Sequence, residues 1–308
     1  SSSFNIERRL AKSHFSTKNI KLCLYRPFDF RWLYYDPNLT SRPAFEVMSH
    51  LLESNVAILC CRQQGVAGFR HLFCTSRLTE RCTVSLNSRE CTYVFPLYLT
   101  SRTSQSEWQF GHASGERANL AENVLKNLEE KLGVAIPAGD VFHYIYAVFH
   151  SPTYRNRYAE FLKIDFPRLP LTSNLELFNT LVKFGEELVA LHLLESPKVN
   201  DFITGFTGKG DNSIPKKPTW KNNAVWINTT QRFERVPENV WNFYIGGYQV
   251  CEKWLKDRKG RTLSADDINH YQKIVVALSK TIRIMTEIDK VIDEHGGWPG
   301  AFEQKGDS

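Results

Sequence analysis

The segment Ile245–Arg261 combines a tight turn with side chains that contact polyanions. Two glycines precede Tyr248 and Gln249, and the spacing that follows predicts a short helix. Five cations then lie within the nine residues 253–261: Lys253, Lys256, Arg258, Lys259 and Arg261. Cations bind phosphates, and planar polar side chains read base edges. The segment therefore predicts contact with a nucleic acid.

A second group of polar residues follows a predicted apolar strand. Arg62, Gln63 and Gln64 precede a glycine, and Arg and Gln are the side chains that pair bidentately with guanine and adenine. Similar polar turns contain Arg77 and Arg89. Each turn taken singly could equally be a solvated loop. We expect base contacts from Arg62, Gln63, Gln64, Arg77 and Gln249, and further contacts with the nucleic acid from Arg70, Arg89 and Tyr248.

The basic charge is concentrated in two blocks, although the net charge is only +6. Residues 1–110 hold 14 Lys and Arg against 8 Asp and Glu, and residues 195–261 hold 12 against 7. The remaining two stretches are mildly acidic. If the two basic blocks lie on one face of the protein, they form a positively charged surface, and the acidic stretches form the scaffold behind it. The alternative is an ordinary charged surface. In the second block we expect phosphate contacts from Lys209, Lys216, Lys217 and Lys221, besides the five cations above.

No complete catalytic motif is found. Phe206–Gly210 spells F-x-G-x-G, a loop with which methyltransferases hold S-adenosylmethionine, but Lys- and Pro-rich sequence follows instead of a helix. No N-P-P-[YF] tetrad, phosphate-binding glycine loop or properly placed acid pair accompanies it. The seven cysteines form no C-x-x-C pair, so no zinc site is expected. We predict no catalytic residue, metal or cofactor in this chain.

The composition is typical of a large folded protein with reduced thiols. Of the 308 residues, 42% are hydrophobic, which is enough for a substantial core. No apolar run approaches the roughly 20 residues of a membrane span, and an odd number of cysteines favours the cytoplasm. The chain starts abruptly at Ser1, and we interpret it as part of a longer polypeptide.

The hydrophobic spacing predicts an α+β fold. Strands are expected first, at 21–25, 56–61, 71–75, 83–86 and 93–99. Helices are expected at 117–132, 141–150 and 152–163, and a capping box at Ser173 opens one that runs to about 195. A basic loop occupies 198–223, and a strand is expected at 224–228.

The longest predicted helix begins at the capping box of Ser264 and Asp267. Its apolar residues are spaced by 3 and 4, which is typical of a seam that packs on another helix. The stripe consists of Ile268, Tyr271, Val275, Leu278, Ile282 and Met285. We expect apolar surface near its C-terminal half to stay uncovered and to dock a partner.

Composition and spacing divide the chain into four parts. A strand-rich part covers 1–110 and a helical scaffold covers 111–197. A basic insertion that contacts nucleic acid covers 198–262, and the long helix with its tail covers 263–308.

Five segments together resemble the C-terminal specificity region of type ISP restriction–modification enzymes and related adenine methyltransferases. They cover most of residues 20–290 and begin with YRPFDFRWLYYDP. The other four are RPAFEVMSHL, YVFPLYL, YIYAVFHSPTYRNRYAEFLKIDFPRLPL and IGGYQVCEKWLKDRKGRTLSADDINHYQKIVVAL. Residues that would form a nuclease, an ATPase and an N-P-P-Y methyltransferase are not found.

The resemblance implies a target recognition domain that positions double-stranded DNA for adenine-N6 methylation by another domain of the same polypeptide. S-adenosylmethionine would bind that domain, and the long helix would correspond to the spacer helix of type I specificity subunits. The recognised bases cannot be carried over, because loops set them. The alternative is a protein-interaction module that docks a methyltransferase or another partner through the amphipathic long helix.

Overall fold

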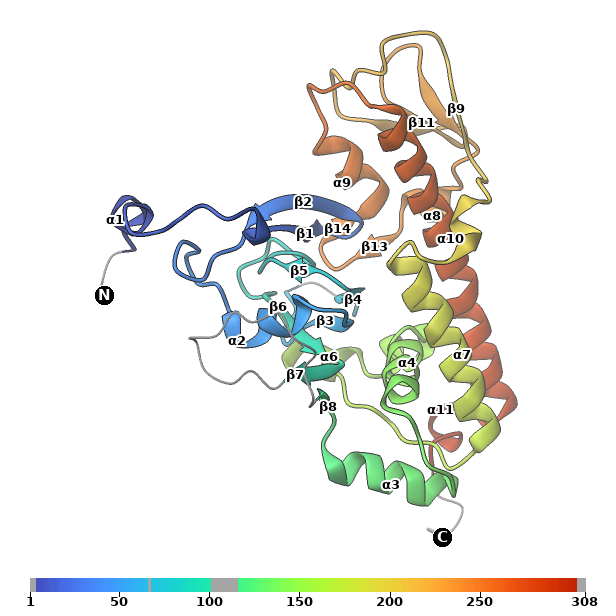
Figure 1. Cartoon of the computed structure of the whole chain (residues 1–308). Helices are drawn as coiled ribbons and strands as arrows, with labels where there is room; N and C mark the ends of the chain where they lie inside the picture. Colours follow the sequence, from blue (N-terminus) through green and yellow to red (C-terminus); the bar gives the residue numbers. More distant parts are fainter. Residues whose placement is uncertain (1–3, 66–67, 101–115, 304–308) are drawn as a thin grey trace.

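The computed structural model describes residues 4–65, 68–100 and 116–303, and it has the predicted α+β class (Figure 1). Small sheets form the N-terminal part, a helical block follows, and one long helix closes the described chain. The predicted boundary at 110–111 lies outside the described residues. Within the described ranges, no helix is both long and apolar enough to cross a lipid bilayer.

Two three-stranded sheets build the N-terminal part. In the first, the hairpin of β1 (Ile20–Arg26) and β2 (Asp29–Tyr34) is extended by β5 (Leu78–Thr79), which runs parallel to β1. The second sheet has the order β4–β3–β6 and is antiparallel throughout. Its strands, in that order, span Leu72–Thr75, Ala57–Cys61 and Thr92–Pro96.

Four of the five strands predicted in this part are confirmed, and the one at 83–86 is wrong. Residues 83–86 form a bend followed by irregular backbone, because Thr83 binds neighbouring backbone instead of joining a ladder. Its hydroxyl donates to the carbonyl oxygen of Leu24 at 3.1 Å and accepts from the amide of Glu80 at 3.2 Å. The predicted strand at 93–99 is divided between β6 and β7 (Tyr98–Thr100), and β7 pairs with β8 (Glu116–Ala118).

The helical block follows the predicted pattern with shifted ends. Gly133 ends α3 (Glu122–Leu132) in the left-handed region, as expected. Ser151 caps the first turn at Pro152, but the predicted helix to 163 breaks at Tyr158. The cap of the following long helix is Asn174, whose side chain accepts from the amide of Leu177, and not Ser173. The remaining helices of the block are α4 (Ala138–Val148), α5 (Pro152–Arg157), α6 (Ala159–Ile164) and α7 (Leu175–His192).

The predicted basic loop at 198–223 is only partly a loop, because it contributes two strands to a four-stranded sheet. Aromatic packing explains this: the rings of Phe206 and Phe233 lie 4.8 Å apart, and Trp220 donates to the carbonyl of Val236. The predicted strand at 224–228 is confirmed in part. The sheet has the order β10 (Thr219–Lys221), β11 (Ala224–Trp226), β12 (Arg232–Glu234) and β9 (Gly205–Thr207).

Short elements complete the chain. Those of the C-terminal part are α8 (Glu238–Trp241), β13 (Tyr244–Ile245), β14 (Tyr248–Gln249), α9 (Val250–Lys256) and α11 (Gly297–Gly300). Those of the N-terminal part are α1 (Ile6–Leu10) and α2 (Phe45–Met48), and single 3-10 turns span Thr17–Asn19, Ser49–Leu51 and Pro197–Asn200.

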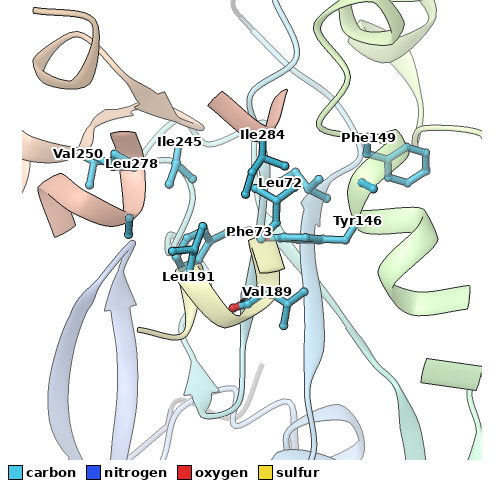
Figure 2. Close-up of a cluster of buried hydrophobic side chains, with 14 of the residues drawn as sticks. Leu72, Phe73, Tyr146, Phe149, Val189, Leu191, Ile245, Val250, Leu278 and Ile284 are labelled. Atoms are coloured by element: carbon cyan, nitrogen blue, oxygen red, sulfur yellow. Dashed lines mark hydrogen bonds between the residues drawn. The ribbon is translucent and has the colours of Figure 1, made fainter. Parts of the chain in front are cut away.

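The long helix α10 (Ala265–Glu294) opens with the predicted capping box. It packs along α7 (Figure 1). Apolar side chains from β4, α7, β13, α9 and α10, with Tyr146 of α4 and Phe149 next to it, form one continuous core (Figure 2). This core joins the strand-rich part to the helices.

The predicted docking seam of α10 is wrong in its C-terminal half. Ile282 and Met285 are half-buried there. The buried stripe instead follows Thr281, Ile284, Ile288 and Ile292. No large apolar side chain of α10, all of whose residues are described, is among the exposed ones. The apolar face of α10 is therefore part of the core, and the expected uncovered apolar surface is not found on this helix.

Candidate nucleic-acid interface

Three loops meet at one end of the β4–β3–β6 sheet. The register pairs Cys60 with Leu72 and Cys61 with Thr92, so the turn after β3, the start of β4 and the approach to β6 share that end. The third loop is the turn between β13 and β14. These are the segments at residues 62–65, 68–71, 85–91 and 244–249, and we refer to them together as the loop cluster.

A buried carboxylate holds two of these loops together. Glu90, whose side chain is 1% exposed, accepts from the amide of Gly65 at 2.6 Å and from Ser85 Oγ at 2.5 Å. It also contacts His71 Nε2 at 3.0 Å. A buried carboxylate is tolerated only with such a full set of donors. The polar sequence at 88–90 therefore contributes a fixed anchor as well as exposed residues.

The electrostatics of this anchor keep Glu90 ionised. Burial alone would raise the pKa of Glu90, but the hydrogen bonds from Ser85, Gly65 and His71 hold that pKa below its ordinary value. Burial lowers the pKa of His71, although Glu90 opposes that change. At neutral pH Glu90 is thus a carboxylate that accepts a hydrogen bond from the neutral imidazole of His71.

The Gly-Gly turn connects the C-terminal part to the loop cluster. The amide of Gly246 donates to the carbonyl of Arg70 at 2.6 Å, and that of Gly247 donates to the carbonyl of Val84 at 2.9 Å. Gly246 has a φ of +57°, and a Cβ there would collide with the Val84 carbonyl. The turn was expected to approach a ligand, but it serves as a joint between two parts of the fold.

The structure separates the predicted base-reading residues of this region. Gln63 and Arg89 are exposed on the loop cluster, and Arg70 is half-buried with its guanidinium 4.7 Å from the centroid of the Tyr244 ring. Arg77 lies after β4, at the opposite end of the strand from Arg70. The cluster therefore gathers Gln63, Arg70 and Arg89 but not Arg77.

Three further predicted readers have internal roles. Gln64 Nε2 donates to the carbonyl of Leu162 at 2.7 Å, and Gln249 Nε2 donates to the carbonyl of Trp241 at 2.7 Å. Tyr248 is 4% exposed and donates to the carbonyl of Cys82 at 2.7 Å. Arg62 is exposed but forms an ion pair with Asp165 at 3.1 Å. Tyr248 was predicted to contact the nucleic acid, but its ring is buried as part of the core.

A second group of cations lies where α9 ends. The backbone of Gly260 and Arg261 pairs with Ile214, at 2.8 Å and 3.0 Å, which places the end of α9 beside the loop that carries Lys216 and Lys217. Lys217 reaches Glu252 of α9 at 2.8 Å. We refer to the exposed members as the α9 cation group, which consists of Lys216, Lys217, Lys256, Lys259 and Arg261.

Two of the five predicted cations of this segment are used inside the protein. Arg258 is 12% exposed, forms an ion pair with buried Asp29 at 2.9 Å and stacks 3.3 Å from the centroid of the Trp254 ring. Lys253 pairs with Asp257 at 2.5 Å. The interpretation of Arg258 as a phosphate contact is wrong, since its guanidinium is paired with Asp29 at the tip of the β1–β2 hairpin.

The remaining predicted lysines lie on the four-stranded sheet. Lys209 is exposed and follows β9 at the end where Thr207 pairs with Arg232. That end also carries Thr219, three residues after Lys216. Lys221 is exposed at the other end of β10, at the turn into β11. Lys209 therefore lies on the side of the α9 cation group, and Lys221 does not.

Comparison with known proteins identifies a family and three structures that share the fold. Residues 2–287 match the profile of the family described as the Type ISP C-terminal specificity domain. No curated protein sequence matches significantly. A structure described as the ATP-dependent Type ISP restriction-modification enzyme LlaBIII bound to DNA is 19% identical, with a TM-score of 0.71. The match covers 94% of this chain and 20% of the LlaBIII chain.

Two further structures share the fold. One is a nuclease-deletion mutant of the Type ISP restriction-modification enzyme LlaGI in complex with a DNA substrate mimic; its identity is 21% and its TM-score 0.65, over 90% of this chain and 25% of its own. The other is a cryoEM structure of a DrdV–DNA complex, with 21% identity and a TM-score of 0.73, over 90% of this chain and 29% of its own. The chain thus spans less than a third of the length of each of these three structures.

Proposed function

The chain belongs to the Type ISP C-terminal specificity domain family, and we propose that it recognises the base sequence of double-stranded DNA for a larger enzyme. That enzyme would methylate adenine N6, with or without DNA cleavage. In this proposal the chain carries no catalytic group of its own. S-adenosylmethionine would bind a methyltransferase domain elsewhere in the same polypeptide, in the cytoplasm, where seven unpaired cysteines are stable.

The observation that carries the proposal is the loop cluster. A rigid sheet end presents Gln63, Arg70 and Arg89 on loops fixed by Glu90, which suits direct reading of base edges. Loops whose backbone is already fixed lose less conformational freedom on binding than free loops do. The DNA complexes of LlaBIII, LlaGI and DrdV have the same fold and support the choice of DNA as the ligand.

The α9 cation group would supply the phosphate contacts. Such contacts fix the register of a protein on the duplex without reading sequence, and they make affinity depend on salt. Base reading and backbone binding would thus belong to different elements, which the Gly-Gly turn and α9 connect.

Selection from a random-sequence duplex library tests the proposal. The chain is incubated with the library, bound duplexes are recovered and amplified, and the enriched sequences are read. We expect one short motif to be enriched over successive rounds. Duplex binding without any enriched motif, or no duplex binding, would contradict sequence recognition and would favour a protein-interaction module.

A further inference from the structure

An apolar surface lies beside the loop cluster, on the second sheet of the N-terminal part. Phe161 and Ile164 of α6 are 71% and 65% exposed, and Tyr93 and Phe95 of β6 are 45% and 41% exposed. Phe166 follows Ile164 by two residues, and its ring packs on the β6 pair, with its centroid 5.0 Å from that of Tyr93 and 5.5 Å from that of Phe95. We refer to these five residues as the β6–α6 patch.

The local sequence places these side chains on the outside. Successive residues of a strand point to opposite faces, so Tyr93 and Phe95 face outward while Val94 packs against the core. On α6, Leu162 is buried, and Phe161 and Ile164 are three residues apart on the other side of the helix. Contiguous exposed aromatic surface of this kind marks an interaction site in a soluble protein.

The composition of the patch favours a protein ligand over DNA. Of the cations near it, Arg62 pairs with Asp165 at 3.1 Å, and Lys163 pairs with Glu160 at 2.5 Å. A phosphate backbone gains its affinity from unpaired cations. Aromatic and aliphatic side chains without net charge instead match the apolar centre of a protein interface.

We propose that the β6–α6 patch docks another domain of the same longer polypeptide. This inference rests on the proposed function, in which the chain is one part of a larger enzyme. The chain covers only 20–29% of the structures that it matches, so such polypeptides contain ample further protein to cover the patch.

The patch lies on the helix that supports one turn of the loop cluster. The amide of Gln64 donates to the carbonyl of Lys163 at 3.1 Å, and its side chain donates to that of Leu162. The same helix therefore carries the exposed apolar residues and supports the turn with Gln63. A domain that docks on α6 is held in a fixed position relative to the base-reading loops.

Site-specific photocrosslinking in the longer polypeptide tests the contact without any assay of activity. Benzoylphenylalanine replaces Phe161, and in a matched control it replaces Lys183, an exposed residue of α7. After irradiation and digestion, mass spectrometry identifies the crosslinked peptides. We expect peptides from outside these 308 residues at position 161 and not at position 183.

Other products overturn the proposal. Crosslinks confined to the 308 residues would mean that the chain covers its own patch. Crosslinks between light and isotopically heavy copies would identify a second copy as the occupant, and crosslinks to added duplex would identify DNA. Crosslinks no stronger than at position 183 would leave the patch without an occupant.

A double substitution links the contact to its effect. Phe161→Glu with Ile164→Glu should leave duplex binding by the 308-residue chain unchanged within about twofold, because both side chains are exposed. In the longer polypeptide it should lower the rate of site-specific methylation about tenfold or more. An unchanged rate contradicts the docking. If the unaltered chain does not bind duplex DNA, the proposed function is contradicted. The crosslinks then still decide whether the patch docks another domain.

Discussion

Glu90 shows how a single buried residue can prepare a recognition surface. It accepts hydrogen bonds from Gly65, Ser85 and His71, and the segments that carry them also contact the Gly-Gly turn. Because its donors come from different loops, the carboxylate fixes their relative positions before any ligand arrives. The exposed residues Gln63 and Arg89 then need little reorganisation to bind.

Base discrimination should depend on the exposed residues of the loop cluster. Replacing Arg89 or Gln63 by Ala should relax the preference at one base position by roughly 1–3 kcal/mol, because a bidentate contact is lost. Library selection with each variant measures this change. Gln64→Ala is the control: it should lower the free energy of unfolding by about 1 kcal/mol and leave the motif intact. An equal loss of affinity for all sequences would assign Arg89 or Gln63 to phosphate contacts.

The pair of Arg258 and Asp29 should matter for stability. Asp29→Ala leaves a guanidinium that is 12% exposed without its buried carboxylate, so the free energy of unfolding should fall by about 3–5 kcal/mol. Lys217→Ala breaks an exposed pair and should cost less than about 1 kcal/mol. Urea denaturation of both variants checks the contrast. Similar small losses would mean that the hairpin tip does not need this ion pair.

Residue type predicted which side chains could bind DNA but not which way they point. Arg258 and Lys256 are two positions apart on the same basic segment, yet one binds Asp29 and the other is exposed. The partner of Arg258 lies more than 200 residues earlier in the chain. Only the tertiary fold brings them together, so local spacing could not distinguish the two roles.

At the scale of elements, the end of α9 should control non-specific affinity. Lys256→Glu with Lys259→Glu should weaken binding to all duplexes alike and flatten the slope of log affinity against log salt by about one unit for each lost phosphate contact. Lys221→Glu, at the other end of β10, is the control, with the same charge change for each substituted residue. Binding measured over a salt series decides this, and a slope equal to that of the control would place α9 away from the backbone.

The end of α7 should make the fold sensitive to acid. His192 lies between Tyr146 and Thr281, and burial lowers its pKa to about 3. In the unfolded chain it takes up a proton below about pH 6.5, whereas in the folded chain it stays neutral. The stability from the neutral ring is complete above that pH. It is lost as the pH falls, by about 1.4 kcal/mol per unit.

Denaturant unfolding between about pH 7 and pH 4 measures that loss. His150 is buried with a depressed pKa as well and contributes with the same sign. His192→Gln should therefore make the pH dependence shallower without abolishing it. A variant whose stability falls as steeply as that of the unaltered chain would show that His192 is not a source of the acid sensitivity.

Element ends were predictable where a local signal fixes them. The capping box at Ser264 and the left-handed Gly133 formed as expected because each acts within one turn. The buried stripe of α10 was not predictable along its full length. A seam spaced by 3 and 4 averages 3.5 residues, whereas a straight helix has 3.6 per turn, so the predicted face rotates away from Ile284 and Ile288.

At the scale of the whole molecule, the fold joins the two proposed DNA-contacting surfaces through one short connection. The loop cluster lies on the N-terminal sheet, the α9 cation group lies on the C-terminal part, and the Gly-Gly turn with α9 links them. The α+β class and the family were predictable because segments spread along most of the chain carry the resemblance. The convergence of the loops was not, because it depends on contacts such as Gly247 with Val84.

The ratio of affinities for two duplexes tests the central claim most directly. One duplex contains the motif enriched in the library, and the other has the same bases in scrambled order at the same salt concentration. If the chain reads sequence, it should bind the first roughly 10³-fold or more tighter than the second. Equal affinity for the two duplexes would contradict sequence recognition and would leave only a cationic surface that binds DNA of any sequence.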